Sequence, residues 1–196
     1  MPAPEPGTRL AERQATRQTL ITALALALGA AVSLGLARFS YALLLPPMRA
    51  DLGWSHFTAG AMNTFNAAGY LVGALAAPWL MRRIGARKAL IGGSLLAAGI
   101  LALHGLVRAD AALYALRLAT GVASAAVFVA GGLMAARLGN RPALGPGITP
   151  SLVLGLYYGG TGLGIVASAL LVPSLVAWPL WSVQGWAQAW IALGAV

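Results

Sequence analysis

The sequence contains no cysteine and only two histidines. The absence of cysteine excludes disulfides, zinc–thiolate sites, iron–sulfur clusters and thiol catalysis. The histidines, His56 and His104, lie far apart in the chain, which argues against an all-histidine metal site. Both fall at the edges of predicted loops, where we expect them to be solvated. We predict no cofactor.

Charged residues are also scarce. Asp, Glu, Lys and Arg make up 9% of the 196 residues, and 59% of the residues are hydrophobic. A soluble domain is typically about 25% charged. Apolar runs of helix length recur along the whole chain, and a water-soluble core could not absorb so many of them. The sequence therefore predicts an all-α integral membrane protein.

Motifs that would indicate an enzyme are missing from the sequence. There is no G-x-x-x-x-G-K-[ST] phosphate loop, which excludes ATP hydrolysis by that route, and no HExxH motif. No nucleophile–base pair stands out either. We predict that the protein is not an enzyme.

The apolar runs divide the chain into a tail and a membrane domain. Residues 1–18 are polar and predict a short disordered cytoplasmic tail, followed by a transmembrane domain over 19–196. A sixth apolar segment, 183–196, is shorter than the roughly 20 residues that a crossing helix needs, so we expect this helix to be truncated. The five full spans are expected at about 20–45, 57–81, 89–107, 111–136 and 150–172.

The basic residues predict the orientation of these spans. Two of them, Arg49 and Arg108, would lie on one side, each near an aspartate. Nine would lie on the other side: Arg9, Arg13, Arg17, Arg82, Arg83, Arg87, Lys88, Arg137 and Arg141. Cytoplasmic loops carry such an excess, so we expect a cytoplasmic amino terminus in a bacterial inner membrane. The net charge of +9 is then a topology signal, with the lipid bilayer and not nucleic acid as the partner.

The 25 glycines gather in the predicted spans, where small residues let helices approach closely. The second and fifth spans also share one spacing, offset by 95 residues: Gly69, Gly73 and Pro78 match Gly164, Ser168 and Pro173. A three-plus-three internal repeat would produce this match.

Two arginines, Arg38 and Arg117, lie inside predicted spans, each about 10 Å below the outer boundary at about 1.5 Å per residue. Such residues usually face a bundle interior or an aqueous cavity, although an arginine can also reach the headgroups along its aliphatic stem. Their matching depth favours a shared polar cavity. No Asp or Glu lies inside any span, so a counter-charge is expected from elsewhere.

Other polar and aromatic residues extend this candidate cavity. Arg38 and Tyr41 are three residues apart and should share a helical face. In the second span, Asn63, Asn66 and Tyr70 lie at i, i+3 and i+7 along one stripe of the helix. The two asparagines could equally form hydrogen bonds between helices. The candidate cavity residues are Arg38, Tyr41, Asn63, Asn66, Tyr70, Arg117, Tyr157 and Tyr158.

Two short motifs resemble signatures of the major facilitator superfamily (MFS). The loop PWLMRRIGARKAL, residues 78–90, is similar to the pattern G-x-L-a-D-r-x-G-r-r, with Pro78 and Arg82 as departures. The resemblance implies a gating loop that includes Arg83, Gly85, Arg87 and Lys88. RLATGVA, residues 117–123, is similar to R-x-x-q-G-x-g. This resemblance implies that Arg117 faces a central cavity and is associated with proton coupling.

Longer stretches resemble the bacterial YbfB/YjiJ group of the same superfamily: ARFSYALLLPPMRADLGWS, GAMNTFNAAGYLVGAL, GVASAAVFVAGG and GLYYGGTGLGIV. The resemblance implies a twelve-span carrier in which this chain forms the amino-terminal six-helix half-bundle. Its partner would be a missing carboxy-terminal half or a second copy. We expect a secondary active transporter of a small, anionic solute, coupled to protons and working by alternating access. The alternative is a non-transporting six-span scaffold or assembly subunit.

Overall fold

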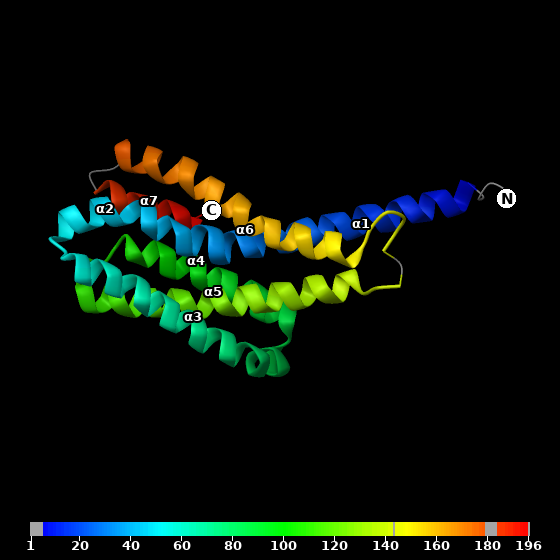
Figure 1. The fold of residues 1–196 in the computed structure, drawn as a ribbon, viewed down its shortest axis with the longest axis horizontal. Coiled ribbons are helices and arrows are strands. Elements are labelled where there is room, and N and C mark those ends of the chain that lie inside the picture. Colours follow the sequence, from blue (N-terminus) through cyan, green and yellow to red (C-terminus); the bar gives the residue numbers. More distant parts are fainter. Residues whose placement is uncertain (1–5, 143, 179–183, 196) are drawn as a thin grey trace.

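The computed structural model describes residues 6–142, 144–178 and 184–195, and these residues form helices and short connections without a strand. Successive crossings run back and forth along one bundle (Figure 1). This confirms the predicted all-α membrane fold. The helical segments are α1 Pro6–Ala30, η1 Ala31–Phe39, α2 Ser40–Leu52, α3 His56–Ile84, α4 Ala86–His104, α5 Asp110–Gly139, α6 Pro150–Ala177 and α7 Gly185–Ala195.

The first crossing is one continuous rod made of α1, η1 and α2. The prediction of a disordered tail is therefore wrong from Pro6 onward, whereas residues 1–5 lie outside the described residues. The segment LAERQATRQ, residues 10–18, consists mostly of good helix formers. Because the apolar span beyond it already supplies the helix nucleus, adding these turns costs little free energy.

Side chains and glycines set the helix ends. Ser55 caps α3 by accepting a hydrogen bond from the Thr58 amide, and Thr149 caps α6 by accepting one from the Leu152 amide. Gly53 ends α2 in the left-handed conformation, with a φ of 66°. These caps match the typical start and stop signals of helices.

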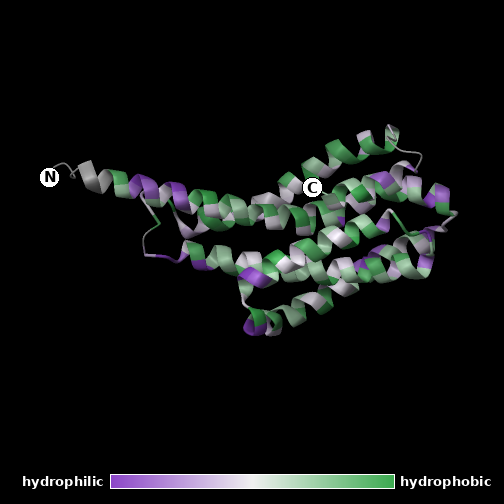
Figure 2. Cartoon of the chain, turned by 180° about the vertical axis from the view of Figure 1, so that it is seen from behind, coloured by the Kyte–Doolittle hydropathy of each residue, from purple (hydrophilic) through white to green (hydrophobic). Residues whose placement is uncertain are grey.

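Among the described residues, four helical segments are long and apolar enough to cross a membrane: Leu10–Leu52, Ala86–His104, Asp110–Gly139 and Pro150–Ala177. The helix α3 has 29 residues but is not among the four. Its polar residues Asn63, Thr64 and Asn66 lower its mean hydropathy. The helix α7 is described over 11 residues. Large apolar side chains cover the outside of the bundle, and hydrophilic residues gather toward the helix ends (Figure 2).

Two close helix crossings support the internal repeat. Gly121 of α5 packs on the α3 backbone around Gly69, where a Cβ on either glycine would overlap the facing chain. Gly35 of η1 packs in the same way against Gly164 of α6. The second helix of each predicted repeat thus packs on the first helix of the other repeat. This exchange is what a three-plus-three half-bundle predicts.

Candidate functional site

Arg117 lies in the first third of α5 and is 1% exposed. Its guanidinium carbon lies 4.2 Å from the centre of the Tyr41 ring, on α2. The Tyr41 hydroxyl donates a hydrogen bond to the carbonyl oxygen of Ala59, 2.8 Å away on α3, and this bond fixes the ring. Arg117 is therefore held among three helices against an aromatic face.

Small residues bring α3 and α5 close enough to enclose this arginine. Gly121, one turn after Arg117, contacts the backbone of α3 directly. Asn66 of α3 is buried, and its side-chain amide donates a hydrogen bond of 3.0 Å to the carbonyl oxygen of Arg117. Asn66 thus performs the interhelical bonding that the sequence left open as its alternative role.

The charge of Arg117 is poorly compensated. None of its three guanidinium nitrogens has a hydrogen-bond partner among the described residues. Burying an ion costs several kcal/mol, whereas a desolvated cation–π contact returns about 2 kcal/mol. No Asp or Glu occurs within the apolar spans predicted from the sequence, at 20–45, 57–81, 89–107, 111–136 and 150–172, to make up the difference. A carboxylate or phosphate would match the fork of guanidinium donors.

Arg38 has different surroundings. It is exposed, and its guanidinium carbon lies 5.9 Å from the centre of the Tyr70 ring. The two arginines therefore differ in burial, and the shared polar cavity stays a prediction. Arg38 and Tyr41 also differ in burial, because Tyr41 is buried. Arg38 belongs to the π-helical segment η1, whose wider turns displace side chains from the positions that an α-helical spacing predicts.

The remaining candidate cavity residues also divide by burial. Asn63 is exposed and Tyr70 is half-buried, although both follow the same stripe of α3 as Asn66. Tyr157 is buried, and its hydroxyl donates a hydrogen bond of 2.7 Å to the carbonyl oxygen of Phe128. Tyr158 is exposed beside it, with the two ring centres 5.2 Å apart. Their roles as cavity residues stay a prediction.

The candidate gating loop is a tight joint between α3 and α4. Gly85 alone separates the two helices, with a φ of 84° that favours glycine. Arg83 lies over the Trp79 ring at 5.6 Å, while Arg87 and Lys88 are exposed in the first turn of α4. The joint therefore presents basic side chains at one end of the bundle, and its role in gating stays a prediction.

Sequence reasoning missed a polar network at the opposite end of the bundle. The carboxylate of Asp51 accepts a hydrogen bond from Arg108 at 2.7 Å and another from the Trp186 indole nitrogen at 2.9 Å. The Trp54 indole nitrogen donates to Asp110 at 2.7 Å. The sequence placed Arg108 beside Asp110, but in the structure it pairs with Asp51. Only the fold brings together partners so far apart in the chain.

The prediction that His104 is solvated is wrong. It is fully buried, not solvated, and its ring stacks on Trp190 of α7 with the ring centres 4.7 Å apart. Its Nδ1 lies 2.8 Å from the carbonyl oxygen of Ile100. The helix α4 extends as far as this residue, and α7 covers it. The sequence carries no local signal for this packing.

Comparison with known families identifies the family of this chain. A family model described as "Uncharacterised MFS-type transporter YbfB" matches residues 30–196. The chain belongs to this family of MFS-type transporters. The matched region includes η1, both arginines and the joint at Gly85. No curated protein matches the chain. As an MFS-type protein it is a multi-pass membrane protein of a transporter family, which agrees with its apolar helices.

Proposed function

We propose that this MFS-type protein is a secondary active transporter that carries a small anionic solute across the bacterial inner membrane by alternating access. The observation that carries the proposal is Arg117, a buried guanidinium with no anionic partner among the described residues. A transporter for anions needs a site of positive potential within the bilayer, and intramembrane ionisable residues usually mark such pathways.

In this proposed role, Arg117 would bind and release an anion in each transport cycle. Tyr41 supports one face of the guanidinium, so its planar fork stays oriented toward an incoming carboxylate or phosphate. Arg38 and the aromatic residues Tyr70 and Tyr158 would provide a second, more accessible point of contact. The rocking of two half-bundles around such a site is the usual form of alternating access.

Proton coupling requires a group that exchanges protons. Because the apolar spans predicted from the sequence contain no Asp or Glu, we propose that a carboxylate of a carboxy-terminal half, or of a second copy, pairs with Arg117 in one state. Protonation of that carboxylate would free Arg117 to bind the anionic solute. Charge would then be balanced at the site in both states of the cycle.

Uptake into vesicles tests this function directly. Purified protein would be reconstituted and supplied with a panel of labelled organic anions, with and without an inward proton gradient. We expect accumulation of at least one class of anion above that in protein-free vesicles, increased by the gradient. A protein that transports none of the panel, and only neutral or cationic solutes instead, would contradict the proposal.

We also propose that the amino terminus is cytoplasmic. This is supported by the nine basic residues at the end of the bundle where α1 begins and α3 and α5 end. Because the protein has no native cysteine, single cysteines can report orientation without background. In intact cells, a membrane-impermeant maleimide should label His56→Cys but not Asn140→Cys, and the reverse pattern would refute this orientation.

A further inference from the structure

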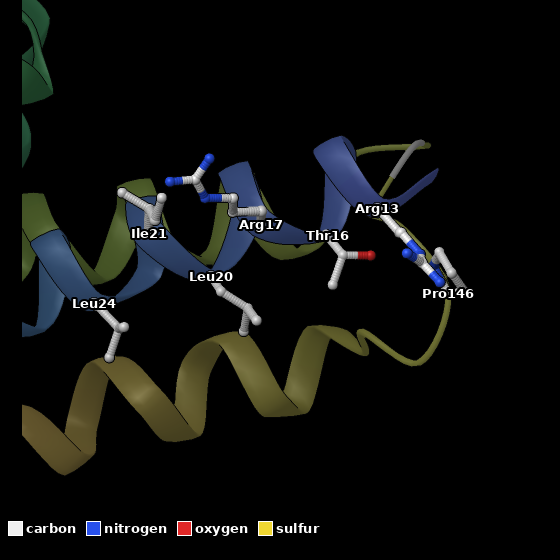
Figure 3. Close-up of a pocket in the computed structure, with 7 residues that line it drawn as sticks. All are labelled: Arg13, Thr16, Arg17, Leu20, Ile21, Leu24 and Pro146. Carbon is white, nitrogen blue, oxygen red and sulfur yellow. The ribbon is translucent and has the colours of Figure 1, made fainter. Parts of the chain in front are cut away.

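A groove runs along the first helix at the basic end of the bundle. The helix α1 extends beyond its neighbours there, and the connection that precedes α6 lies beside it (Figure 1). The groove has a volume of about 470 Å³ (Figure 3). It is lined by Arg13, Thr16, Arg17, Leu20, Ile21, Leu24 and Pro146.

The chemistry of this groove changes along its length. Arg13 and Arg17 are one helical turn apart at the outer end, and both are exposed. Leu20, Ile21 and Leu24 follow toward the middle of the bundle, and Ile21 and Leu24 are 54% and 51% exposed. The groove therefore passes from cationic to hydrocarbon surface within about 16 Å, at about 1.5 Å per residue.

The far wall of the groove is fixed in place. Gly145 has a φ of 89° and lies directly against Thr16. A Cβ at Gly145 would lie 2.7 Å from the Thr16 backbone nitrogen, so only glycine permits this approach. Pro146 is thereby held beside the polar end of the groove (Figure 3).

The two arginines are not neutralised within the groove. No acidic residue lines it, and neither Arg13 nor Arg17 forms an ion pair within the part of the chain that the structure describes. The neighbouring Glu12 lines a separate cavity together with Arg141. The outer end of the groove thus presents two positive charges beside exposed hydrocarbon.

We propose that this groove is a binding site for an anionic phospholipid. The headgroup phosphate would lie between Arg13 and Arg17, where guanidinium groups can form charge-assisted hydrogen bonds with its oxygens. One acyl chain would lie along Leu20, Ile21 and Leu24. A water-soluble phosphate would gain nothing from the apolar half of the groove, which is why a lipid fits better. This site does not depend on the transported solute.

Native mass spectrometry of the purified protein with equal amounts of phosphatidylglycerol and phosphatidylcholine tests the site. Each arginine near an anionic lipid should favour binding about fivefold. We therefore expect Arg13→Gln/Arg17→Gln to reduce the retention of phosphatidylglycerol more than tenfold relative to phosphatidylcholine. The matched control is Arg82→Gln/Arg137→Gln, which removes the same charge from exposed positions outside the groove. An equal loss in both variants would show diffuse attraction and overturn the site.

Two further experiments distinguish a bound lipid from a free phosphate and test whether the segment at Gly145 forms one wall of the groove. Millimolar glycerol phosphate should not displace phosphatidylglycerol, and displacement would show that the ligand is a small phosphate. Gly145→Val leaves both arginines intact but moves the wall away from Thr16. We expect it to reduce lipid retention severalfold while the helical circular dichroism signal is unchanged. Unchanged retention would contradict a groove built by this wall.

Discussion

The sequence predicts similar environments for the two intramembrane arginines, whereas the structure buries one and exposes the other. Arg117 is enclosed among α2, α3 and α5 against Tyr41, whereas Arg38 is exposed beside Tyr70. Their depth along the helices is similar, so depth does not decide which arginine is buried. The packing of the facing helix decides which arginine is buried, because Gly121 brings α3 against α5 one turn from Arg117. Burial of a charge is here a property of helix packing and not of span position.

This difference assigns different energetic roles to the two charges. Arg38 can be hydrated or can extend along its stem toward polar surroundings, so its charge costs little. Arg117 has no such freedom and gives up stability to keep a charge in place. A buried residue that destabilises its own fold is best explained by function.

Replacing Arg117 by methionine should therefore stabilise the bundle. Exchanging an uncompensated buried ion for an apolar side chain of similar length is expected to raise the free energy of unfolding by about 1–4 kcal/mol. Thermal unfolding in detergent would measure this change, with Arg38→Met as the comparison. A destabilisation of similar size in Arg117→Met would mean that the native guanidinium is already well compensated.

The two glycine crossings should behave alike, in contrast to the arginines. Gly121→Ala and Gly35→Ala each place a methyl group on a facing backbone, which should destabilise the bundle by about 1–3 kcal/mol. Gly99→Ala is the control, because its Cβ meets no atom within 4 Å and alanine is the better helix former. If denaturant titrations show that Gly121→Ala is tolerated and Gly35→Ala is not, the two crossings are not equivalent.

Tyr41 and its hydroxyl can be tested separately. Tyr41→Phe keeps the ring under Arg117 and removes the hydrogen bond to Ala59, which should cost about 1 kcal/mol of stability and leave uptake intact. Tyr41→Leu also removes the aromatic face, and we expect uptake to fall with it. Equal uptake in the two variants would show that the ring does not orient the guanidinium.

Arg38→Gln should have the smallest effect on stability. The side chain is exposed, so we expect the free energy of unfolding to change by less than about 0.5 kcal/mol. In the uptake assay the variant should bind the anion more weakly, with a higher KM and little change in maximal rate. A large loss of stability would indicate that Arg38 is packed like Arg117.

Periodicity and composition predicted most of the fold. Apolar runs located the crossings, and the spacing of Gly69 and Gly164 indicated the repeat, because both signals are local and both follow from the lipid environment. The burial of His104 and the pairing of Arg108 with Asp51 could not be predicted, because their partners lie far away in the chain. Arg38 lies in the π-helical segment η1, and no residue pattern predicted this segment.

The most direct test of the central claim is the uptake of an anion into vesicles that contain Arg117→Gln. Arg137→Gln is the matched control, because it removes the same charge from an exposed position on the same helix. We expect Arg137→Gln to retain the uptake of the unaltered protein and Arg117→Gln to fall to the level of protein-free vesicles. Equal uptake by the two variants would contradict the assignment of Arg117 to the transport site.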